Sequence, residues 1–242
     1  MGMFDEGVEG IVKRQMVLFF VIDTSGSMMG TKIGAVNTAI REVLPELQGA
    51  GGADVDLKVA CLTFSTGCQW MYPSPIEADN FQWNNVEAEG VTDLGAACRE
   101  LSEKMSKNGF LKAPSGSVAP AIFLMSDGEP TDDWEKGLDL LKQNNWFKYA
   151  IKVAVAIGDD ANKDVLAKFT GTIEAVITVH TPEALKKWIR KVSITSSQIG
   201  SKSQPATDGQ IQSKQDAMIE EIKEIQQTEP DLDTTSTSGD DW

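Results

Sequence analysis

The stretch that decides the fold is MVLFFVI (residues 16–22), which is followed directly by DTSGS (residues 23–27). Seven consecutive apolar residues, most of them branched or aromatic, are typical of a strand that is buried on both faces. Such a strand belongs in a parallel sheet that is covered by helices on both sides. The polar run after it then forms the loop at the carboxyl end of the strand, where open α/β sheets bind their ligands.

The rest of the chain alternates strand and helix patterns. Strands are predicted at 55–65, 119–125, 149–158 and 174–179, and helices at 32–47, 94–105, 131–141, 162–169 and 182–192. This alternation predicts an α/β fold with a doubly wound, mainly parallel central sheet of about six strands flanked by helices. Residues 68–73 are predicted to add an antiparallel strand at one edge.

The charge distribution divides the chain into a domain and a tail. Of the net charge of −14, residues 195–242 contribute ten acidic residues and three lysines, which is −7. We predict a domain over 1–194, a linker over 195–213 rich in Ser, Thr and Gln, an amphipathic helix over 214–227 and a disordered acidic tail over 228–242. The apolar stripe of that helix either docks into a partner or packs back on the domain; the Ser/Thr run at 234–238 is a candidate for phosphorylation.

The composition also restricts the partners and the compartment. An acidic chain of 22 basic and 36 acidic residues lacks the basic surface that nucleic acids and anionic membranes require. The apolar run at 16–22 is too short to span a bilayer, and the first fifteen residues lack a secretory core, so we expect no membrane insertion. Three scattered cysteines without a CxxC pair indicate a reducing compartment, and a cytoplasmic protein is expected.

Three groups of side-chain oxygens are expected at one edge of the sheet. Asp23, Ser25 and Ser27 alternate after the first strand, Asp127 follows the strand at 119–125, and Thr92 precedes a helix. If the two strands are neighbours at the switch point of the sheet, the three loops converge. Carboxylates and hydroxyls without a nearby His or Cys favour Mg²⁺, with Mn²⁺ or Ca²⁺ as alternatives, over zinc.

Each group also has a plainer interpretation. Asp23, Ser25 and Thr92 are residue types that cap helices, and Ser-Asp-Gly at 126–128 is a common turn. We assign the acidic residues shortly after this turn, with a neighbouring threonine, to a helix N-terminus and not to the metal. These residues are Glu129, Thr131, Asp132 and Asp133. His180, the only histidine, is assigned a structural or solvated role.

An apolar strand followed by D-x-S-x-S, a threonine in a later loop and a strand ending in Asp-Gly resembles the von Willebrand factor A domain family. The resemblance covers about residues 13–194 and implies a metal-ion-dependent adhesion site formed by Asp23, Ser25, Ser27, Thr92 and Asp127. The phrases DTSGSM, GVTDLGAA and LMSDGEPTD are most similar to the bacterial TerY-like branch, which is associated with tellurium resistance and stress response. That branch usually has Gly-Gly-Thr where this chain has Gly90-Val91-Thr92, which puts the conformation of this loop in question.

Two enzymatic interpretations are considered and set aside. Asp-Thr-Ser-Gly at 23–26 resembles the Asp-Thr-Gly of aspartic proteases, but those proteins are all-β. Phosphatases of the haloacid-dehalogenase type place a second aspartate two residues after the first, where Ser25 stands here, so the usual general acid is missing. With a single histidine, a histidine-based triad with Ser or Cys is not available. No catalytic residue is assigned.

The expected function is therefore metal-dependent protein–protein interaction without catalysis, in which a partner supplies Asp or Glu to Mg²⁺. The resemblance implies, as partners, a kinase and a PP2C-type phosphatase from the same gene cluster. An alternative is an adaptor or scaffold that contacts its partner through the helix at 214–227 and has a purely structural metal. A metal-dependent hydrolase is the third class.

Overall fold

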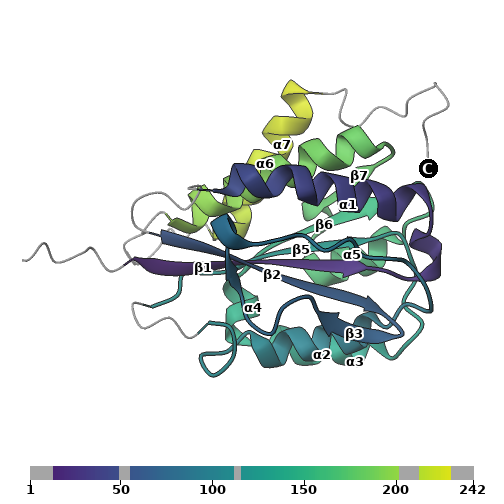
Figure 1. Cartoon of the computed structure of the whole chain (residues 1–242), viewed down its shortest axis with the longest axis horizontal. Coiled ribbons are helices and arrows are strands. Elements are labelled where there is room, and N and C mark those ends of the chain that lie inside the picture. The colour runs from purple at the N-terminus through teal and green to yellow at the C-terminus, as the bar shows by residue number, and fades with distance from the viewer. Residues whose placement is uncertain (1–12, 49–54, 112–115, 202–212, 230–242) are drawn as a thin grey trace, which may run out of the picture.

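A 7-stranded sheet forms the central layer of the computed structural model, which describes residues 13–48, 55–111, 116–201 and 213–229 (Figure 1). The strand order is β3-β2-β1-β5-β6-β7, with β4 paired to β2. The strands are β1 (Arg14–Asp23), β2 (Val55–Ser65), β3 (Gly67–Trp70), β4 (Ile76–Glu77), β5 (Ala121–Ser126), β6 (Ile151–Ile157) and β7 (Val176–Val179). Only β3 and β4 run antiparallel, at the β2 edge, so the predicted α/β architecture and the antiparallel edge strand are confirmed.

Strand β1 lies in the middle of the sheet, parallel to β2 on one side and to β5 on the other. Its side chains alternate between the two cores: Leu18 and Phe20 belong to one, Phe19 and Val21 to the other. All four are at most 1% exposed. The uninterrupted apolar run is therefore explained by burial on both faces.

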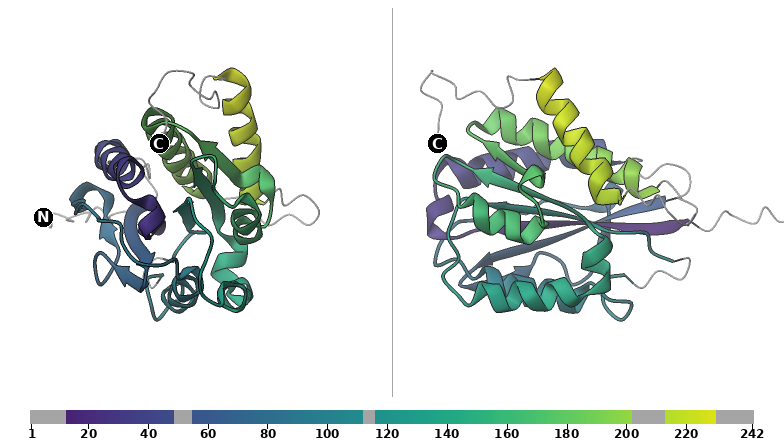
Figure 2. Two further views of the ribbon diagram at one scale, coloured as in Figure 1. Left: turned by 90° about the vertical axis from the view of Figure 1, so that its right-hand side faces the viewer. Right: turned by 180° about the vertical axis from the view of Figure 1, so that it is seen from behind.

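Helices cover both faces of the sheet (Figure 2). One face is covered by α1 (Thr31–Val43), α6 (Pro182–Ser201) and α7 (Lys214–Thr228), and the other by α2 (Leu94–Lys104), α3 (Trp134–Gln143), α4 (Asn145–Tyr149) and α5 (Lys163–Thr170). Short 3₁₀ turns lie at η1 (Gly26–Met28), η2 (Leu44–Leu47), η3 (Ala78–Asn80) and η4 (Ile173–Ala175). Among the described residues, no helix is long and apolar enough to cross a membrane.

Helix α6 corrects the predicted linker at 195–213. The helix continues to Ser201, and residues 202–212 lie outside the described part of the chain. Its second half is rich in serine, but Ser193 and Ser196 are fully buried and Ile199 is largely so. Small side chains fit between packed elements as readily as they occur in linkers, so composition alone gave the wrong boundary.

Helix α7 packs on the domain, which is one of the two alternatives left open by the sequence. Its stripe residues Met218, Ile219 and Ile222 are buried, and Met218 and Ile222 belong to the same core as α1 and α6. The Gln215 side chain accepts from the backbone N–H of Lys152 (2.7 Å) and donates to the C=O of the same residue (2.9 Å). This apolar face is therefore covered within the molecule. The predicted disordered tail lies outside the described residues from position 230.

Two further differences concern the chain after β5. The helix predicted over 131–141 begins at Trp134, and α4 was not predicted at all. Asn144 ends one helix and begins the next, since its side-chain oxygen accepts from the N–H groups of Trp146 and Phe147. An isolated helix of this length has no periodicity to detect, so sequence pattern did not indicate it.

Candidate metal centre

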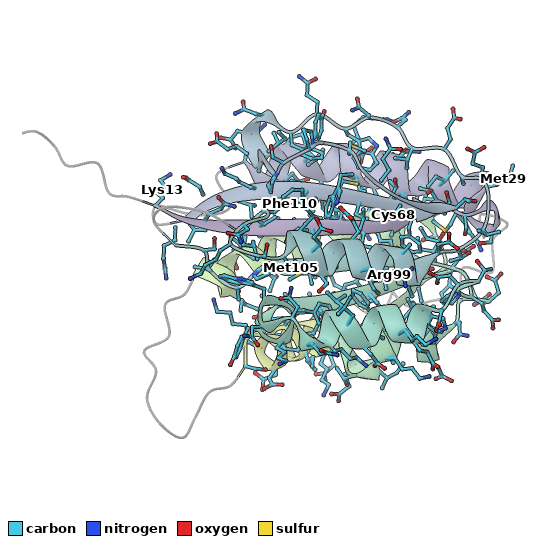
Figure 3. All side chains as sticks on the ribbon, turned by 90° about the horizontal axis from the view of Figure 1, so that it is seen from below. Lys13, Met29, Cys68, Arg99, Met105 and Phe110 are labelled. Atoms are coloured by element: carbon cyan, nitrogen blue, oxygen red, sulfur yellow. The ribbon has the colours of Figure 1, made fainter. Side chains whose placement is uncertain are left out.

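The proposed ligands meet where the chain changes direction in the sheet. From β1 the chain proceeds to β2 on one side, and β5 lies on the other side of β1. The chain leaves β1 toward α1 on one face of the sheet and leaves β5 toward α3 on the other face. The two loops therefore border a crevice at the edge of the sheet, the usual ligand position in open α/β sheets. Figure 3 labels Met29, just beyond the β1 loop, at this end of the molecule and Lys13, just before β1, at the opposite end.

Asp23, the last residue of β1, is completely buried, and each of its carboxylate oxygens accepts a hydrogen bond. Its Oδ1 accepts from the backbone N–H of Ser25 at 2.8 Å, and its Oδ2 accepts from the Ser126 hydroxyl at 2.5 Å. Burial raises the pKa of this carboxyl, while the hydrogen bonds from Ser126 and Ser25 act against that rise. The carboxylate is thus held in one orientation by groups from β1 and β5.

Serine hydroxyls connect the two aspartates. Ser27 Oγ donates to Asp127 Oδ1 over 2.7 Å, and it lies 3.0 Å from Ser25 Oγ. Ser25 and Asp127 are almost fully buried, whereas Ser27 is exposed. The D-x-S-x-S alternation therefore turns the oxygens of Asp23, Ser25 and Ser27 toward the end of β5, as the sequence predicted.

Thr92 reaches the same place from the loop before α2. Its backbone N–H donates to Thr131 Oγ1 (3.0 Å), and its C=O accepts from the Thr131 N–H (2.8 Å), which ties the loop to the β5–α3 connection. Gly90 has a φ of 78°, and a Cβ there would lie 2.5 Å from Thr66 Oγ1, so only glycine fits. Val91 is 45% exposed and points away from the core. Valine at this position leaves Thr92 in place.

The oxygens converge on one small volume beside Gly128. An ideal Cβ built on Gly128 would lie 3.3 Å from Ser27 Oγ, 3.5 Å from Asp23 Oδ2 and 3.5 Å from Thr92 Oγ1. The end of β1 and its loop thus present the Asp23 and Ser27 oxygens, and the loop before α2 presents the Thr92 hydroxyl, to one point that Gly128 leaves open because it has no side chain. Hard oxygen donors around a small volume suit Mg²⁺, Mn²⁺ or Ca²⁺. The described residues contain no group of three or more His, Cys, Asp or Glu suited to a metal, so an ion here depends on the hydroxyls.

Lys32 is a member of the site that the sequence analysis missed. Its Nζ donates to Asp127 Oδ2 at 2.5 Å and lies 3.4 Å from Asp160 Oδ1. Partial burial lowers the pKa of this ammonium, but the hydrogen bond and charge of Asp127 outweigh burial and raise it overall. The sequence did carry a signal, because Lys32 stands in the first turn of α1, where the helix dipole disfavours a cation.

The other polar residues near the site have supporting roles. Asp132 accepts from the N–H groups of Gly95 and Ala96, both at 2.9 Å, so it caps α2 from the loop before α3. Glu129 accepts from Asn162. His180 Nδ1 lies 2.9 Å from the exposed Asp159, a surface contact as expected for a residue without a site role.

Residues 18–191 match the von Willebrand factor type A domain family. The match spans most of the chain, and the chain belongs to this family of metal-dependent adhesion and protein-interaction domains. The resemblance inferred from the D-x-S-x-S pattern is thereby confirmed at the level of the family. Membership of this family does not by itself place the chain in the TerY-like branch.

The chain matches only a small part of the length of its curated relatives. Inter-alpha-trypsin inhibitor heavy chain H4 from Homo sapiens is 31% identical over 133 residues, which is 51% of this chain and 13% of that protein. Heavy chain H6 from Homo sapiens is 27% identical over 176 residues, 66% of this chain and again 13% of the relative. The chain thus corresponds to about one eighth of these proteins.

Solved structures share the fold at low sequence identity. A von Willebrand factor type A protein from Catenulispora acidiphila has a TM-score of 0.57 at 18% identity, over 76% of this chain and 43% of that one. The pilus adhesin SpaC from Lactobacillus rhamnosus GG has a TM-score of 0.59 at 16% identity, over 77% and 30%. Proximal thread matrix protein 1 from the mussel byssus, described with a zinc-occupied MIDAS motif, has 0.57 at 17%, over 76% and 48%.

Proposed function

We propose that this protein binds a divalent ion, Mg²⁺ in the cell, through Asp23, Ser25, Ser27, Thr92 and Asp127, and uses it to bind an Asp or Glu side chain of a partner protein. The observation that carries the proposal is the convergence of Ser27, Asp23 and Thr92 oxygens to within 3.5 Å of one point beside Gly128. Membership of a family of metal-dependent interaction domains supports the same function.

The chemistry of the donor set favours an anionic partner. The two carboxylates offset the charge of a divalent ion, and the three hydroxyls are neutral donors. With this donor set the ion stays electrophilic enough to bind a further anionic oxygen. When bound, the ion supplies a Lewis-acidic position that accepts one more oxygen ligand. Asp23 and Asp127 are both buried beneath the loops, so the side of the site that remains open to a partner is the one formed by the exposed Ser27.

Two exposed apolar side chains adjoin the proposed ligands and favour protein over small-molecule recognition. Met29 is 64% exposed two residues after Ser27, and Val91 is 45% exposed next to Thr92. Apolar side chains around a polar centre are a common composition of protein interfaces. We expect the partner to place its carboxylate at the ion and apolar residues on Met29 and Val91.

Zinc is the competing choice of metal. The mussel byssus protein is described with zinc in its MIDAS motif, but that describes a different protein. The five proposed ligands of this chain are all oxygen donors, and zinc sites in proteins generally include His or Cys. We therefore propose Mg²⁺ and keep Zn²⁺, Mn²⁺ and Ca²⁺ as arms of the binding experiment.

The finer biological assignment rests on the sequence phrases alone. DTSGSM, GVTDLGAA and LMSDGEPTD support a TerY-like protein of a bacterial stress-resistance or defence pathway that acts in the cytoplasm. On that assignment, a kinase and a PP2C-type phosphatase are the first partners to test.

The experiment is capture of those candidate partners on the immobilised full chain in Mg²⁺, followed by elution with EDTA. Asp127→Asn and Thr92→Ala remove a proposed ligand each, and Asp159→Asn is the matched control because Asp159 is an exposed acid on a neighbouring loop. The proposal requires partner binding by the wild type and Asp159→Asn, release by EDTA and loss in the two site variants. Binding that is indifferent to EDTA and to both site variants would refute it.

The two alternatives give different results. An adaptor that uses α7 would lose its partner on deletion of residues 213–242 but not on chelation; burial of Met218 and Ile222 within the domain argues against it. A hydrolase would turn over phosphate esters or peptides and lose this activity in Asp127→Asn.

A further inference from the structure

The ammonium of Lys32 lies between two carboxylates of different character. Asp127, at 2.5 Å from Nζ, has a fully buried side chain, whereas Asp160, at 3.4 Å, has a side chain that is 75% exposed. Lys32 itself is only 14% exposed in its side chain. Within the described residues this is the cation placed directly on a proposed metal ligand, and nothing in the D-x-S-x-S pattern requires it.

A divalent ion and this ammonium compete for the same carboxylate. Asp127 Oδ2 is taken by Lys32, while Oδ1 accepts from Ser27. Two positive charges at one buried carboxylate repel each other, and the repulsion is stronger in a partly buried site than in water. The ammonium must therefore either lower the affinity for the ion or move away when the ion binds.

The structure provides a second position for the ammonium. Asp160 Oδ1 lies within ion-pair distance of Nζ, at 3.4 Å, and the lysine side chain is flexible enough to close a gap of this size. Gly158 keeps the path open: a Cβ there would lie 3.0 Å from Asp160 Oδ1, 3.3 Å from Lys32 Cε and 3.4 Å from Lys32 Nζ. With a φ of 91°, Gly158 also holds this loop in a conformation that other residues rarely adopt.

We propose that Lys32 is an internal counter-ion that exchanges between Asp127 and Asp160, and thereby sets the affinity of the site for its divalent ion. In the metal-free protein Lys32 neutralises the buried Asp127. In the metal-bound protein it pairs with Asp160. The inference rests on the proposed metal site and adds the residues that tune it.

Four variants of the full chain test the exchange. Lys32→Met keeps the length of the side chain without its charge, and Asp160→Asn removes the second position. The double variant shows whether Asp160 acts through Lys32. Asp159→Asn is the matched control, because it removes one neighbouring exposed acid that contacts His180 and not Lys32. Affinity for Mn²⁺ and Mg²⁺ is measured by calorimetry, and the melting temperature is measured in EDTA and in Mg²⁺.

The exchange predicts effects of opposite sign. Lys32→Met binds Mn²⁺ about tenfold more tightly than the wild type or better, but melts at a lower temperature in EDTA because Asp127 is left buried and unpaired. Asp160→Asn binds Mn²⁺ more weakly by a larger factor than Asp159→Asn does. In the Lys32→Met background, Asp160→Asn has no more effect than Asp159→Asn.

Three results overturn the inference, and they are separable from failure of the proposed function. Unchanged or weaker Mn²⁺ binding in Lys32→Met refutes competition. An equal effect of Asp160→Asn with and without Lys32 shows that Asp160 acts only by long-range charge and refutes the exchange. If the wild type binds no divalent ion while Lys32→Met still melts early in EDTA, the proposed function fails and the lysine is a fixed ion-pair partner of Asp127.

Discussion

The hydroxyl of Ser126 donates to Asp23 Oδ2 across the β5–β1 boundary, over 2.5 Å. The same Ser126 Oγ accepts from the backbone N–H of Gly128 at 3.2 Å. One serine therefore fixes the carboxylate at the end of β1 and the turn that carries Asp127 and Gly128. It is a positioning residue for both halves of the proposed metal site.

We expect Ser126→Ala to lower the free energy of unfolding in EDTA by about 1–3 kcal/mol, because the buried carboxylate of Asp23 loses a hydrogen bond. The affinity for Mn²⁺ falls as well, since Asp23 is no longer held in place. Urea denaturation and calorimetry measure the two effects. Ser106→Ala is the comparison for a change remote from the site, because it removes a half-buried serine just after α2 whose hydroxyl donates to the C=O of Glu103 and accepts from the N–H of Gly109. A Ser126→Ala variant with full metal affinity would show that the proposed site does not need this hydrogen bond.

Gly128→Ala tests the volume in which the oxygens meet. Gly128 does not have a positive φ, so alanine is compatible with the backbone. Its methyl group would stand 3.3–3.5 Å from Ser27, Asp23 and Thr92 oxygens, where an ion would have to lie. We expect a folded protein that has lost most of its Mn²⁺ affinity, measured by calorimetry.

The control for this variant is Gly34→Ala. Gly34 lies in α1 with no atom within 4 Å of an added Cβ, so the substitution should retain metal binding. It should also raise stability by about 0.5–1 kcal/mol, because glycine is unfavourable inside a helix. Metal binding by Gly128→Ala equal to that of Gly34→Ala would place the ion elsewhere.

Helix α7 is predicted to be part of the folded domain. Met218 is completely buried in the core, so Met218→Ala should lower the free energy of unfolding by about 2–5 kcal/mol in chemical denaturation. Lys223→Ala, also on α7, removes only a half-exposed ion pair with Glu174 of η4 and should cost less than about 1 kcal/mol. Equal and small effects of both substitutions would mean that α7 does not dock in solution.

Lys152 gives a pH dependence that can be assigned to one residue. Burial lowers the pKa of its ammonium to about 8, although Nζ donates to the C=O groups of Phe147 and Ala150. The folded protein releases this proton more readily than the unfolded chain does, so the buried ammonium destabilises the folded state. This cost is full below about pH 8 and is relieved as the pH rises from about 8 toward the ordinary lysine pKa of 10.5.

The stability of the wild type relative to Lys152→Met should therefore increase by about 2 kcal/mol between pH 7.5 and pH 9.5. Denaturation curves at a series of pH values measure the difference, and all other titrating groups cancel between the two proteins. A difference that stays constant with pH would show that Lys152 has an ordinary pKa.

The fold and the five proposed ligands could be predicted from local sequence because short, contiguous patterns of residues indicate both. The run at 16–22 is apolar on both faces of a strand, and the polar residues follow it without a gap. Asp127 was found for the same reason, at the end of the apolar strand β5. The parallel pairing of β1 with β5 then brings these two loops together.

The residues that the sequence did not reveal have partners that lie far away along the chain. Lys32 lies 95 positions before Asp127, and Asp132 caps a helix that begins 38 positions earlier, at Leu94. Neither partnership has a local pattern. The end of α6 was misplaced for a different reason: buried serines such as Ser193 and Ser196 resemble a linker in composition but pack like small apolar residues.

The most direct test of the proposed site is a crystal structure of the full chain grown with Mn²⁺, in which anomalous scattering locates the ion. The account predicts a single strong peak beside Gly128, within about 2–2.5 Å of hydroxyl oxygens of Ser25, Ser27 or Thr92, and weakened in Asp127→Asn crystals. A peak at another acidic cluster, or no peak at this position in a crystal that binds Mn²⁺ elsewhere, would contradict it.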